Sequence, residues 1–208
     1  MFEALAVIVG YLLGSIPTAY IVGRLVRGVD IRQIGGGNMG ALNTARELSP
    51  AWGALVLAID IAKGAGGVLI AKALGVERVW VYLAGFAAVI GHCWPAFLKF
   101  KGGKGAATGL GVLFALAPIS FACIIPLTIG VIILTSNVTL GMAVGFLFYP
   151  LFLWVFDRPV SDIIFAVLIA IFLALRYLPT ALKAAKKSGG AGSFIIEKNY
   201  KPWQSKRR

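Results

Sequence analysis

The nine residues 100–108, FKGGKGAAT, place Lys101, Lys104 and three glycines between two long apolar runs. Glycines lack a Cβ atom, so their backbone amides can approach a ligand closely. The apolar run that starts at Ala106 predicts a helix whose N-terminus faces the same point, and helix N-termini favour anions. The stretch therefore predicts an anion-binding loop. In the alternative interpretation, Lys99, Lys101 and Lys104 only anchor a membrane helix at the cytoplasmic surface, which would not require three glycines.

The composition is that of an integral membrane protein. Of the 208 residues, 59% are hydrophobic and only 13% are charged, whereas soluble domains carry about 25% charged residues. The mean hydropathy is +0.89. The formal net charge of +12 is concentrated in residues 24–46, 99–104 and 176–208, a pattern typical of cytoplasmic loops beside anionic lipid. Nucleic-acid binding, the competing interpretation of a basic chain, would need a soluble basic domain, which such an apolar chain does not offer.

The order of apolar runs predicts the membrane topology, because one helical span needs about 20 apolar residues. We expect an all-α, polytopic membrane helix bundle with about seven transmembrane helices, and six or eight as alternatives. An odd number puts the N-terminus outside and the three basic clusters in the cytoplasm. The predicted domains are a single polytopic transmembrane domain over residues 1–182 and a basic, flexible cytoplasmic tail over residues 183–208. The predicted spans are residues 4–26, 51–74, 79–94, two spans within 106–134 that turn near Pro118, 138–156 and 163–178.

A second glycine-rich loop follows the first predicted span, at residues 35–46, GGGNMGALNTAR. Asn38 and Asn43 supply amide donors, and Arg46 supplies a guanidinium group suited to a phosphate. A helix beginning near Asn38 would place Asn43 and Arg46 three residues apart on one face. A flexible solvated linker, the alternative, would not need these residues at helical spacing. The predicted binding residues in this loop are Gly37, Asn38, Gly40, Asn43 and Arg46.

Three ionisable residues interrupt or end the apolar runs. Asp60 and Lys63 lie three apart and can neutralise each other, but charges within a bilayer are costly and are usually functional. A structural salt bridge, or a Lys63 that reaches the membrane surface, is the alternative. His92 has either a direct role or a structural hydrogen bond. Phe97 stands five positions after His92, so a common acyltransferase signature of histidine and acid is absent, and no second histidine or nearby carboxylate makes a metal site.

Both glycine-rich loops are cytoplasmic by the charge rule, so they can converge on one polar pocket at the inner leaflet. Such a pocket suits a ligand that carries phosphate and an apolar chain. Nucleotide hydrolysis does not fit, because Lys104 is followed by Gly105 instead of Ser or Thr. A small transporter for an anionic metabolite would be expected to show an internal repeat, and none is found. A noncatalytic lipid-binding scaffold would not need two donor-rich loops.

Four motifs carry a resemblance to a known family. They are residues 14–17 (GSIP), residues 37–43 followed by Arg46, Asp60 with Lys63-Gly64, and residues 91–105, which end in the lysine loop. In this order they resemble the bacterial acyl-phosphate-dependent glycerol-3-phosphate acyltransferases of the inner membrane, over the first 110 residues or so. The resemblance implies transfer of a fatty acyl group from acyl phosphate to the 1-hydroxyl of sn-glycerol 3-phosphate, which gives lysophosphatidic acid and phosphate in phospholipid biosynthesis. It also implies a seven-span fold, an active site on the cytoplasmic side, and no coenzyme A or acyl carrier protein as donor.

The expected roles follow from the chemistry of an acyl phosphate, which is already activated and needs no covalent nucleophile. Lys104 and Arg46 are expected to neutralise the phosphates, and a substrate phosphate or His92 to act as the base. The expected substrates are glycerol 3-phosphate and acyl phosphate, with membrane lipids and a soluble acyl-phosphate-producing enzyme as further partners. No cofactor, metal or nucleic acid is expected. The expected substrate-binding residues are Gly37, Asn38, Gly40, Asn43, Asp60, Lys63, Lys101, Gly102, Gly103 and Gly105.

The chain departs from the family's usual pattern at three positions. Gly36 stands where the family usually has serine. Tyr177 and Thr180 stand where it has a histidine and an asparagine shortly after the last span. A divergent paralogue with an altered substrate is therefore a second hypothesis for the same fold.

Overall fold

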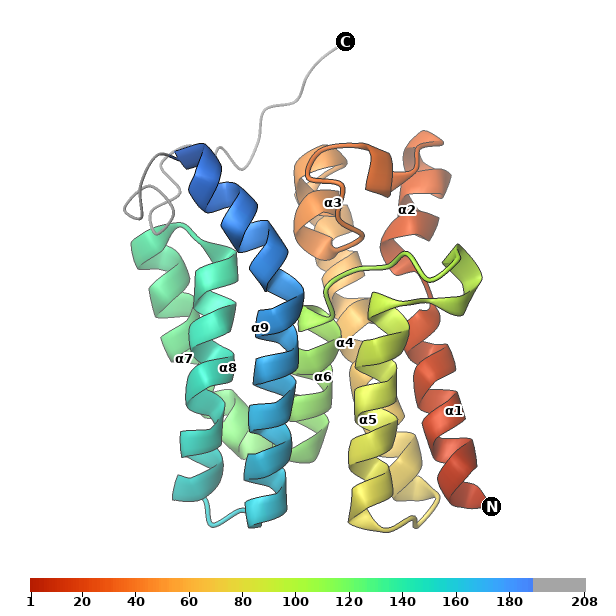
Figure 1. Ribbon diagram of the computed structural model, residues 1–208, viewed down its shortest axis with the longest axis vertical. Helices are drawn as coiled ribbons and strands as arrows, with labels where there is room; N and C mark the ends of the chain where they lie inside the picture. Colours follow the sequence, from red (N-terminus) through yellow and green to blue (C-terminus); the bar gives the residue numbers. More distant parts are fainter. Residues whose placement is uncertain (189–208) are drawn as a thin grey trace. The chain divides into compact units, whose positions relative to one another are not determined.

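The computed structural model describes residues 1–188, with side chains as far as residue 182. Every regular element in this part of the chain is helical (Figure 1). Contacts divide the chain into two compact units, Met1–Leu116 and Ala117–Arg208. The elements are α1 (Phe2–Ser15), α2 (Thr18–Arg27), η1 (Ile31–Gln33), α3 (Ala41–Glu47), α4 (Pro50–Ala73), α5 (Arg78–Cys93), η2 (Ala96–Leu98), α6 (Ala106–Leu116), α7 (Pro118–Thr135), α8 (Val138–Val155) and α9 (Val160–Ser188), where η marks a 3₁₀ helix.

Six stretches of the described chain are long and apolar enough to cross a membrane. The all-α, polytopic fold class is thus confirmed. The first of the two spans predicted within residues 106–134 corresponds to α6, which has only 11 residues. At 1.5 Å per residue it rises about 16 Å, about half the thickness of a bilayer core. The turn predicted near Pro118 is confirmed, since α6 ends at Leu116 and α7 begins with that proline. The six stretches are Phe2–Arg27, Pro50–Ala73, Arg78–Leu98, Pro118–Thr135, Val138–Val155 and Val160–Leu182.

The first unit is built on close contacts between small residues. α1 lies along α5, and α4 packs against α1, α5 and α6 (Figure 1). A Cβ atom at Gly14 of α1 would collide with the carbonyl group of Ala88 on α5, and one at Gly64 of α4 would collide with that of Thr108 on α6. Contacts of this kind let membrane helices approach until their backbones touch, which compensates for the weak hydrophobic drive inside lipid.

The first span is broken at the proline that the sequence singled out. α1 ends at Ser15 and α2 begins at Thr18, because Pro17 has no amide hydrogen to continue the helix. Beyond the break, α2, η1 and α3 lie at the end of the unit opposite the N-terminus, together with the loop between α5 and α6 (Figure 1). The helix expected to begin near Asn38 begins instead at Ala41, because Gly40 before it is extended, with φ −150° and ψ 169°.

A small apolar core supports the glycine-rich loop of residues 35–46. It consists of Ala19 and Val22 from α2, Ile31 from η1, Met39 from the loop and Val56 from α4, all buried. Because the loop contributes Met39 to this core, the polar residues on either side of Met39 are held in one place. The alternative interpretation of this loop, a flexible solvated linker, is therefore wrong.

In the second unit, α7 packs on α8 and α8 packs on α9. A Cβ atom at Gly145 of α8 would collide with the hydroxyl of Thr128 on α7, so small residues again mark the contact. Arg158 and Asp162 form an ion pair of 3.1 Å at the turn before α9.

The last helix is longer than hydropathy predicts. α9 covers Val160–Ser188, whereas the apolar run predicts residues 163–178. Alanine, leucine and lysine are strong helix formers, so the helix continues through polar sequence beyond the apolar run. The rest of the predicted basic tail, residues 189–208, lies outside the described residues, and the boundary after residue 182 stays a prediction.

Candidate active site

Asn43 shapes the glycine-rich loop of residues 35–46. Its Oδ1 atom accepts a hydrogen bond of 2.9 Å from the Gly36 amide, and its Nδ2 atom donates to the carbonyl oxygens of Ile31 and Ile34 at 3.0 and 3.2 Å. The side chain is buried. The amide was expected to bind substrate, but its donors and acceptor are engaged by the backbone of residues 31–36, so Asn43 fixes the loop from within.

The other predicted residues of this loop lie nearer its surface. Asn38 and Gly40 are half-buried, and Arg46, in the last turn of α3, is exposed. Asn43 and Arg46 were expected to share one face of a helix. The structure gives them different surroundings, with Asn43 turned into the loop and Arg46 accessible to a ligand.

The lysine loop, residues 99–105, requires its glycines. The Gly102 amide donates to the Cys93 carbonyl at 3.2 Å, and the Gly103 amide donates to the His92 carbonyl at 3.0 Å. A Cβ atom at Gly103 would overlap the Nε2 atom of His92 and would lie 2.7 Å from the Met39 carbonyl oxygen. Gly105 has φ +88°, a conformation that other residues rarely adopt. The loop is thus pressed against the end of α5 at a spacing that only glycine permits.

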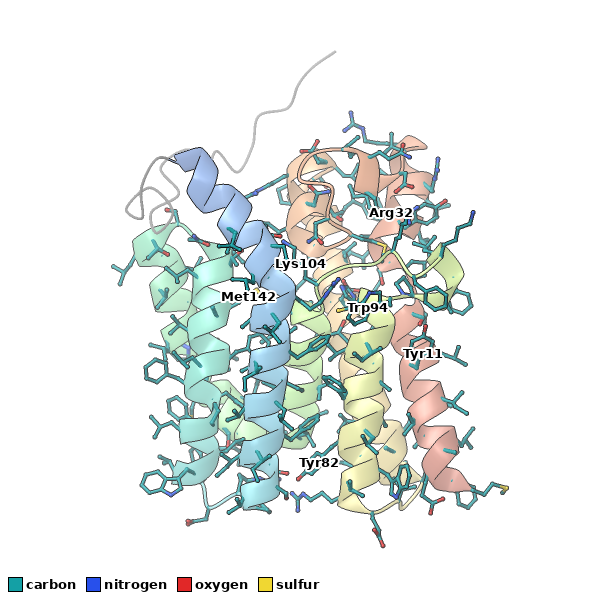
Figure 2. The ribbon with its side chains drawn as sticks, in the orientation of Figure 1. Tyr11, Arg32, Tyr82, Trp94, Lys104 and Met142 are labelled. Atoms are coloured by element: carbon teal, nitrogen blue, oxygen red, sulfur yellow. The ribbon has the colours of Figure 1, made fainter. Side chains whose placement is uncertain are left out.

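Lys104 stands between Gly103 and Gly105, directly before α6 (Figure 2). Its side chain is half-buried. The amides of a helix N-terminus attract anions, and the anion-binding role of Lys104 stays a prediction.

The two glycine-rich loops are in contact. The Nη1 atom of Arg32 donates to the Lys101 carbonyl at 3.4 Å, and Gly103 lies against the backbone of Met39. Arg32 itself is held by Asp30, with an ion pair of 2.7 Å and a cation–π contact of 5.2 Å with the Tyr20 ring. Hydrogen bonding from Arg32 lowers the pKa of Asp30 below its usual value, so the carboxylate stays charged.

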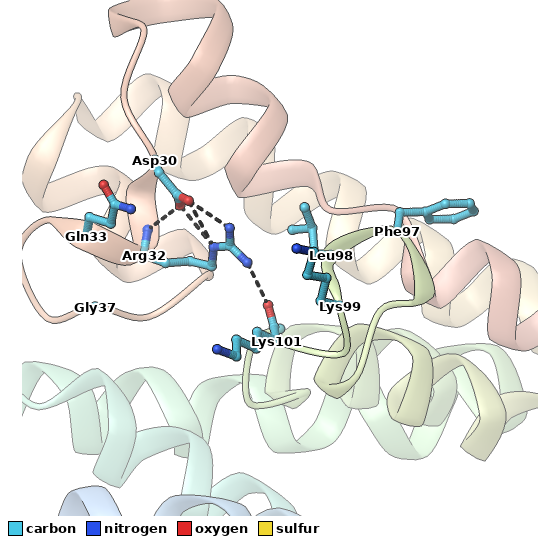
Figure 3. A pocket seen from close by; sticks show the side chains of 9 residues that line it. Asp30, Arg32, Gln33, Gly37, Phe97, Leu98, Lys99 and Lys101 are labelled. Carbon is cyan, nitrogen blue, oxygen red and sulfur yellow. Dashed lines mark hydrogen bonds and ion pairs between the residues drawn. The ribbon is translucent and has the colours of Figure 1, made fainter.

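A pocket of about 580 Å³ lies at this junction (Figure 3). Of the predicted substrate-binding residues, it brings together Gly37, Lys101 and Gly102. Lys104 and Arg46 do not line it. The sequence did not predict Asp30, Arg32 or Gln33 as site residues; an acid two positions before an arginine was a usable signal for the first two. The full lining is Asp30, Arg32, Gln33, Gly37, Phe97, Leu98, Lys99, Lys101 and Gly102.

Asp60, Lys63 and His92 form a buried cluster below the loops. Asp60 and Lys63 make an ion pair of 2.9 Å, the Thr18 hydroxyl donates to Asp60 at 3.1 Å, and Lys63 donates to the Ile16 carbonyl at 2.9 Å. The Nδ1 atom of His92 lies 3.8 Å from Asp60. The structural alternative for Asp60 and Lys63 thus gains support, since both charges brace the break between α1 and α2.

The remaining departures from the family pattern lie in the second unit. Tyr177 and Thr180 both fall within α9, Val160–Ser188. Among the described residues, no group of three or more His, Cys, Asp or Glu is arranged to hold a metal ion.

Comparison with known proteins extends the similarity beyond these motifs. Residues 4–186 match the family model of glycerol-3-phosphate acyltransferase. A glycerol-3-phosphate acyltransferase of Dehalococcoides mccartyi is 36% identical over 204 residues, which cover 93% of this chain and 96% of the relative. One from Moorella thermoacetica is 43% identical over 161 residues, covering 77% of this chain and 82% of the relative.

Solved structures agree with the sequence relatives. The crystal structure of PlsY (YgiH), an integral membrane glycerol 3-phosphate acyltransferase, in its glycerol 3-phosphate form, has a TM-score of 0.82 and 35% identity, and the match covers 89% of this chain and 92% of that one. Its lysophosphatidic acid form gives a TM-score of 0.80 and 34% identity over the same shares of the two chains. The chain therefore belongs to the glycerol-3-phosphate acyltransferase family and is a multi-pass membrane acyltransferase.

Proposed function

We propose that the enzyme transfers a fatty acyl group from acyl phosphate to the 1-hydroxyl of sn-glycerol 3-phosphate. The products are lysophosphatidic acid and inorganic phosphate. The observation that carries the proposal is the contact between the two glycine-rich loops, in which Gly103, the neighbour of Lys104, lies against the backbone of Met39. The relatives support it, because PlsY has been solved in a glycerol 3-phosphate form and a lysophosphatidic acid form.

The reaction needs no covalent enzyme intermediate. The hydroxyl oxygen of glycerol 3-phosphate attacks the carbonyl carbon of the acyl phosphate, and the bond from that carbon to the phosphate oxygen then breaks. Lys104 and Arg46 neutralise the phosphate charges, which lowers the cost of bringing two anions together and of releasing phosphate. Asn38 and the backbone amide of Gly40 are proposed to orient the phosphate and carbonyl oxygens.

The proton of the attacking hydroxyl must pass to a base. A phosphate oxygen and His92 are the two candidates. His92 is only 4% exposed, and its ring lies between Gly103 and Asp60, so a substrate hydroxyl has little access to it. This burial favours a phosphate oxygen as the acceptor, with His92 holding the lysine loop in position.

We further propose that the N-terminus lies outside and the loops lie on the cytoplasmic face of a bacterial inner membrane. The last turn of α2 carries Arg24 and Arg27. This helix lies at the same end of the first unit as the loop between α5 and α6 (Figure 1), and basic loops favour the cytoplasm. A soluble enzyme that makes acyl phosphate could supply the donor there. Cysteines introduced separately at Lys99 and at Gly75, at opposite ends of the unit, would test this: only the Lys99 position should react with an impermeant thiol reagent in inverted vesicles.

The decisive assay incubates the purified protein with palmitoyl phosphate and glycerol 3-phosphate. We expect equal amounts of lysophosphatidate and phosphate, and no product when palmitoyl coenzyme A replaces palmitoyl phosphate. Counterflow of glycerol 3-phosphate into vesicles without any product would indicate the transporter instead. The assay should also include other acceptors, because the chain departs from the family pattern at Gly36, Tyr177 and Thr180. Acylation of a different phosphorylated alcohol would indicate a paralogue with an altered substrate.

A further inference from the structure

The pocket between η1 and the lysine loop is lined by a set of cations that the proposed reaction does not use. Arg32, Lys99 and Lys101 surround it, whereas Lys104 and Arg46 do not line it. We propose that this pocket binds the phosphate group of an acidic phospholipid from the surrounding bilayer. Gly37, Lys101 and Gly102 then contact a lipid headgroup instead of a substrate.

Charge determines the class of ligand. Three cationic side chains and one carboxylate line the pocket. The carboxylate of Asp30 is bound by Arg32, with Nε to Oδ1 at 3.0 Å and Nη2 to Oδ2 at 2.7 Å, so it neutralises that guanidinium. The exposed ammonium groups of Lys99 and Lys101 are left without an acidic residue among the lining, which makes the pocket suited to an anion and unsuited to a metal cation.

The backbone around Lys99 is held in a costly conformation. Lys99 has φ 52° and ψ 40°, and Phe100 has φ 58°, so two consecutive residues with side chains adopt a region that normally costs about 1 kcal/mol or more per residue. Hydrogen bonds of 3.1 Å from the amides of Leu98, Phe100 and Lys101 maintain this turn. Such strain persists where a particular placement of side chains is required. Here the turn places Lys99 and Lys101 at the pocket.

The apolar rim indicates that the ligand comes from the membrane. Phe97 and Phe100 are 63% and 61% exposed, and the Phe97 ring points away from Arg32 and the centre of the pocket (Figure 3). A soluble phosphate would not need exposed aromatic rings beside its site. A phospholipid would, because aromatic rings favour the boundary between headgroups and acyl chains.

A groove between α1 and α5 offers room for the lipid chains. It has a volume of about 630 Å³ and is lined, apart from the Tyr11 hydroxyl, by apolar side chains of α1 and α5, among them Leu12, Phe86 and Ile90. The Tyr11 hydroxyl donates to the Trp94 carbonyl at 2.9 Å, so the groove reaches the first residue of the segment that carries η2 and the lysine loop (Figure 2).

The test measures binding of short-chain phosphatidylglycerol to the purified full-length protein in neutral detergent, followed by native mass spectrometry. A phosphodiester is the right probe, because it is neither a substrate nor a product of the proposed acyl transfer. One lysine near a lipid phosphate contributes about fivefold in affinity, so we expect Lys99→Gln to weaken binding by about that factor and the Lys99→Gln/Lys101→Gln variant to weaken it further. Lys72→Gln, which removes a cation at the other end of α4, should bind as the wild type does.

Two controls separate the sources of phosphate. Short-chain phosphatidylcholine and inorganic phosphate should bind much more weakly than phosphatidylglycerol, and replacing Phe97 and Phe100 with serine should weaken only the lipid. Equal losses for Lys99→Gln and Lys72→Gln, or equal binding of inorganic phosphate and phosphatidylglycerol, would overturn the proposal. Because no acyl donor is present, these outcomes are independent of the acyltransferase assay. In that assay, Lys99→Gln should keep the activity of the wild type in neutral lipid.

Discussion

The Nδ1 atom of His92 lies 3.8 Å from the Oδ1 atom of Asp60, and both side chains are buried. The same carboxylate binds Lys63 and Thr18, while the other edge of the imidazole lies against Gly103. One buried acid therefore connects the break between α1 and α2 with the floor of the lysine loop. Changes within this cluster should affect stability and the loop together.

Asp60→Asn should destabilise the protein strongly. It leaves the Lys63 ammonium buried without its counter-charge, and removing one partner of a buried pair costs about 3–5 kcal/mol. Asp60→Leu combined with Lys63→Met should recover much of this loss, although the Thr18 hydroxyl and the Ile16 carbonyl would lose their partners. Thermal unfolding in detergent measures both variants. A stable Asp60→Asn protein with a raised KM for glycerol 3-phosphate would instead show that Asp60 contacts the substrate.

Gly103→Ala should reduce kcat/KM by about 100-fold, since displacing a catalytic group by about 1 Å can have an effect of this size. The added Cβ atom would overlap the His92 ring, and the loop with Lys104 would have to move. Gly36→Ala is the matched control, because the nearest atom to its Cβ would be the Asn43 Oδ1 atom at 3.5 Å. Equal activity of the two variants would mean that the position of the loop is not critical.

The sequence predicted the long helices well because the bilayer imposes one simple requirement, a long apolar run. α4 and α5, at Pro50–Ala73 and Arg78–Cys93, differ from the predicted spans by one residue at each end. Hydropathy predicted the helices poorly where factors other than burial in lipid determine their length. It missed the polar extension of α9, which helix propensity favours, and it gave α6 the status of a full span.

The site was predictable in its parts but not in its arrangement. The glycines and Lys104 could be proposed from the sequence because glycine-rich sequence with lysines has a direct chemical meaning. The contact of Arg32 with Lys101 joins residues 69 positions apart, and only the folded chain brings them together. Asn43 was predicted to bind substrate because the sequence does not show the folded contacts of its side chain. In the structure, its amide group is hydrogen-bonded to the backbone of residues 31–36.

Gly36→Ser should improve the binding of glycerol 3-phosphate. The position has space for a side chain, is exposed, and has no positive φ. A hydroxyl there could donate to a phosphate, and hydrogen bonds to charged groups contribute about 1.5–3 kcal/mol, so KM should fall by about tenfold. Gly36→Ala should bring no gain. A KM that rises in the serine variant would place the phosphate away from this part of the loop.

Asp30→Asn should loosen the contact between the two loops. Arg32 holds the pKa of Asp30 below its usual value, so the stabilisation is fully present above the ordinary carboxyl pKa of about 3.9. It is lost only as the pH falls through the lowered pKa of the folded state. Hydrogen exchange of the amides of residues 99–103 should therefore be faster in Asp30→Asn than in the wild type between pH 5 and 8, by a factor that does not change with pH. A difference that grew or vanished within that range would indicate another titrating group.

Lys104→Ala should lower kcat by about 1,000-fold, an effect of the size seen when a group that stabilises transition-state charge is removed. The residue lies between two glycines at the start of α6 and is half-buried, so the loss of its ammonium group should not unfold the helices. Lys99→Gln is the control, because it removes one charge from the same loop. Lys99 lines the pocket with Arg32 and Lys101, which Lys104 does not line. A Lys104→Ala protein with normal unfolding temperature and normal turnover would remove Lys104 from the site, and with it the proposal that the lysine loop holds the leaving phosphate.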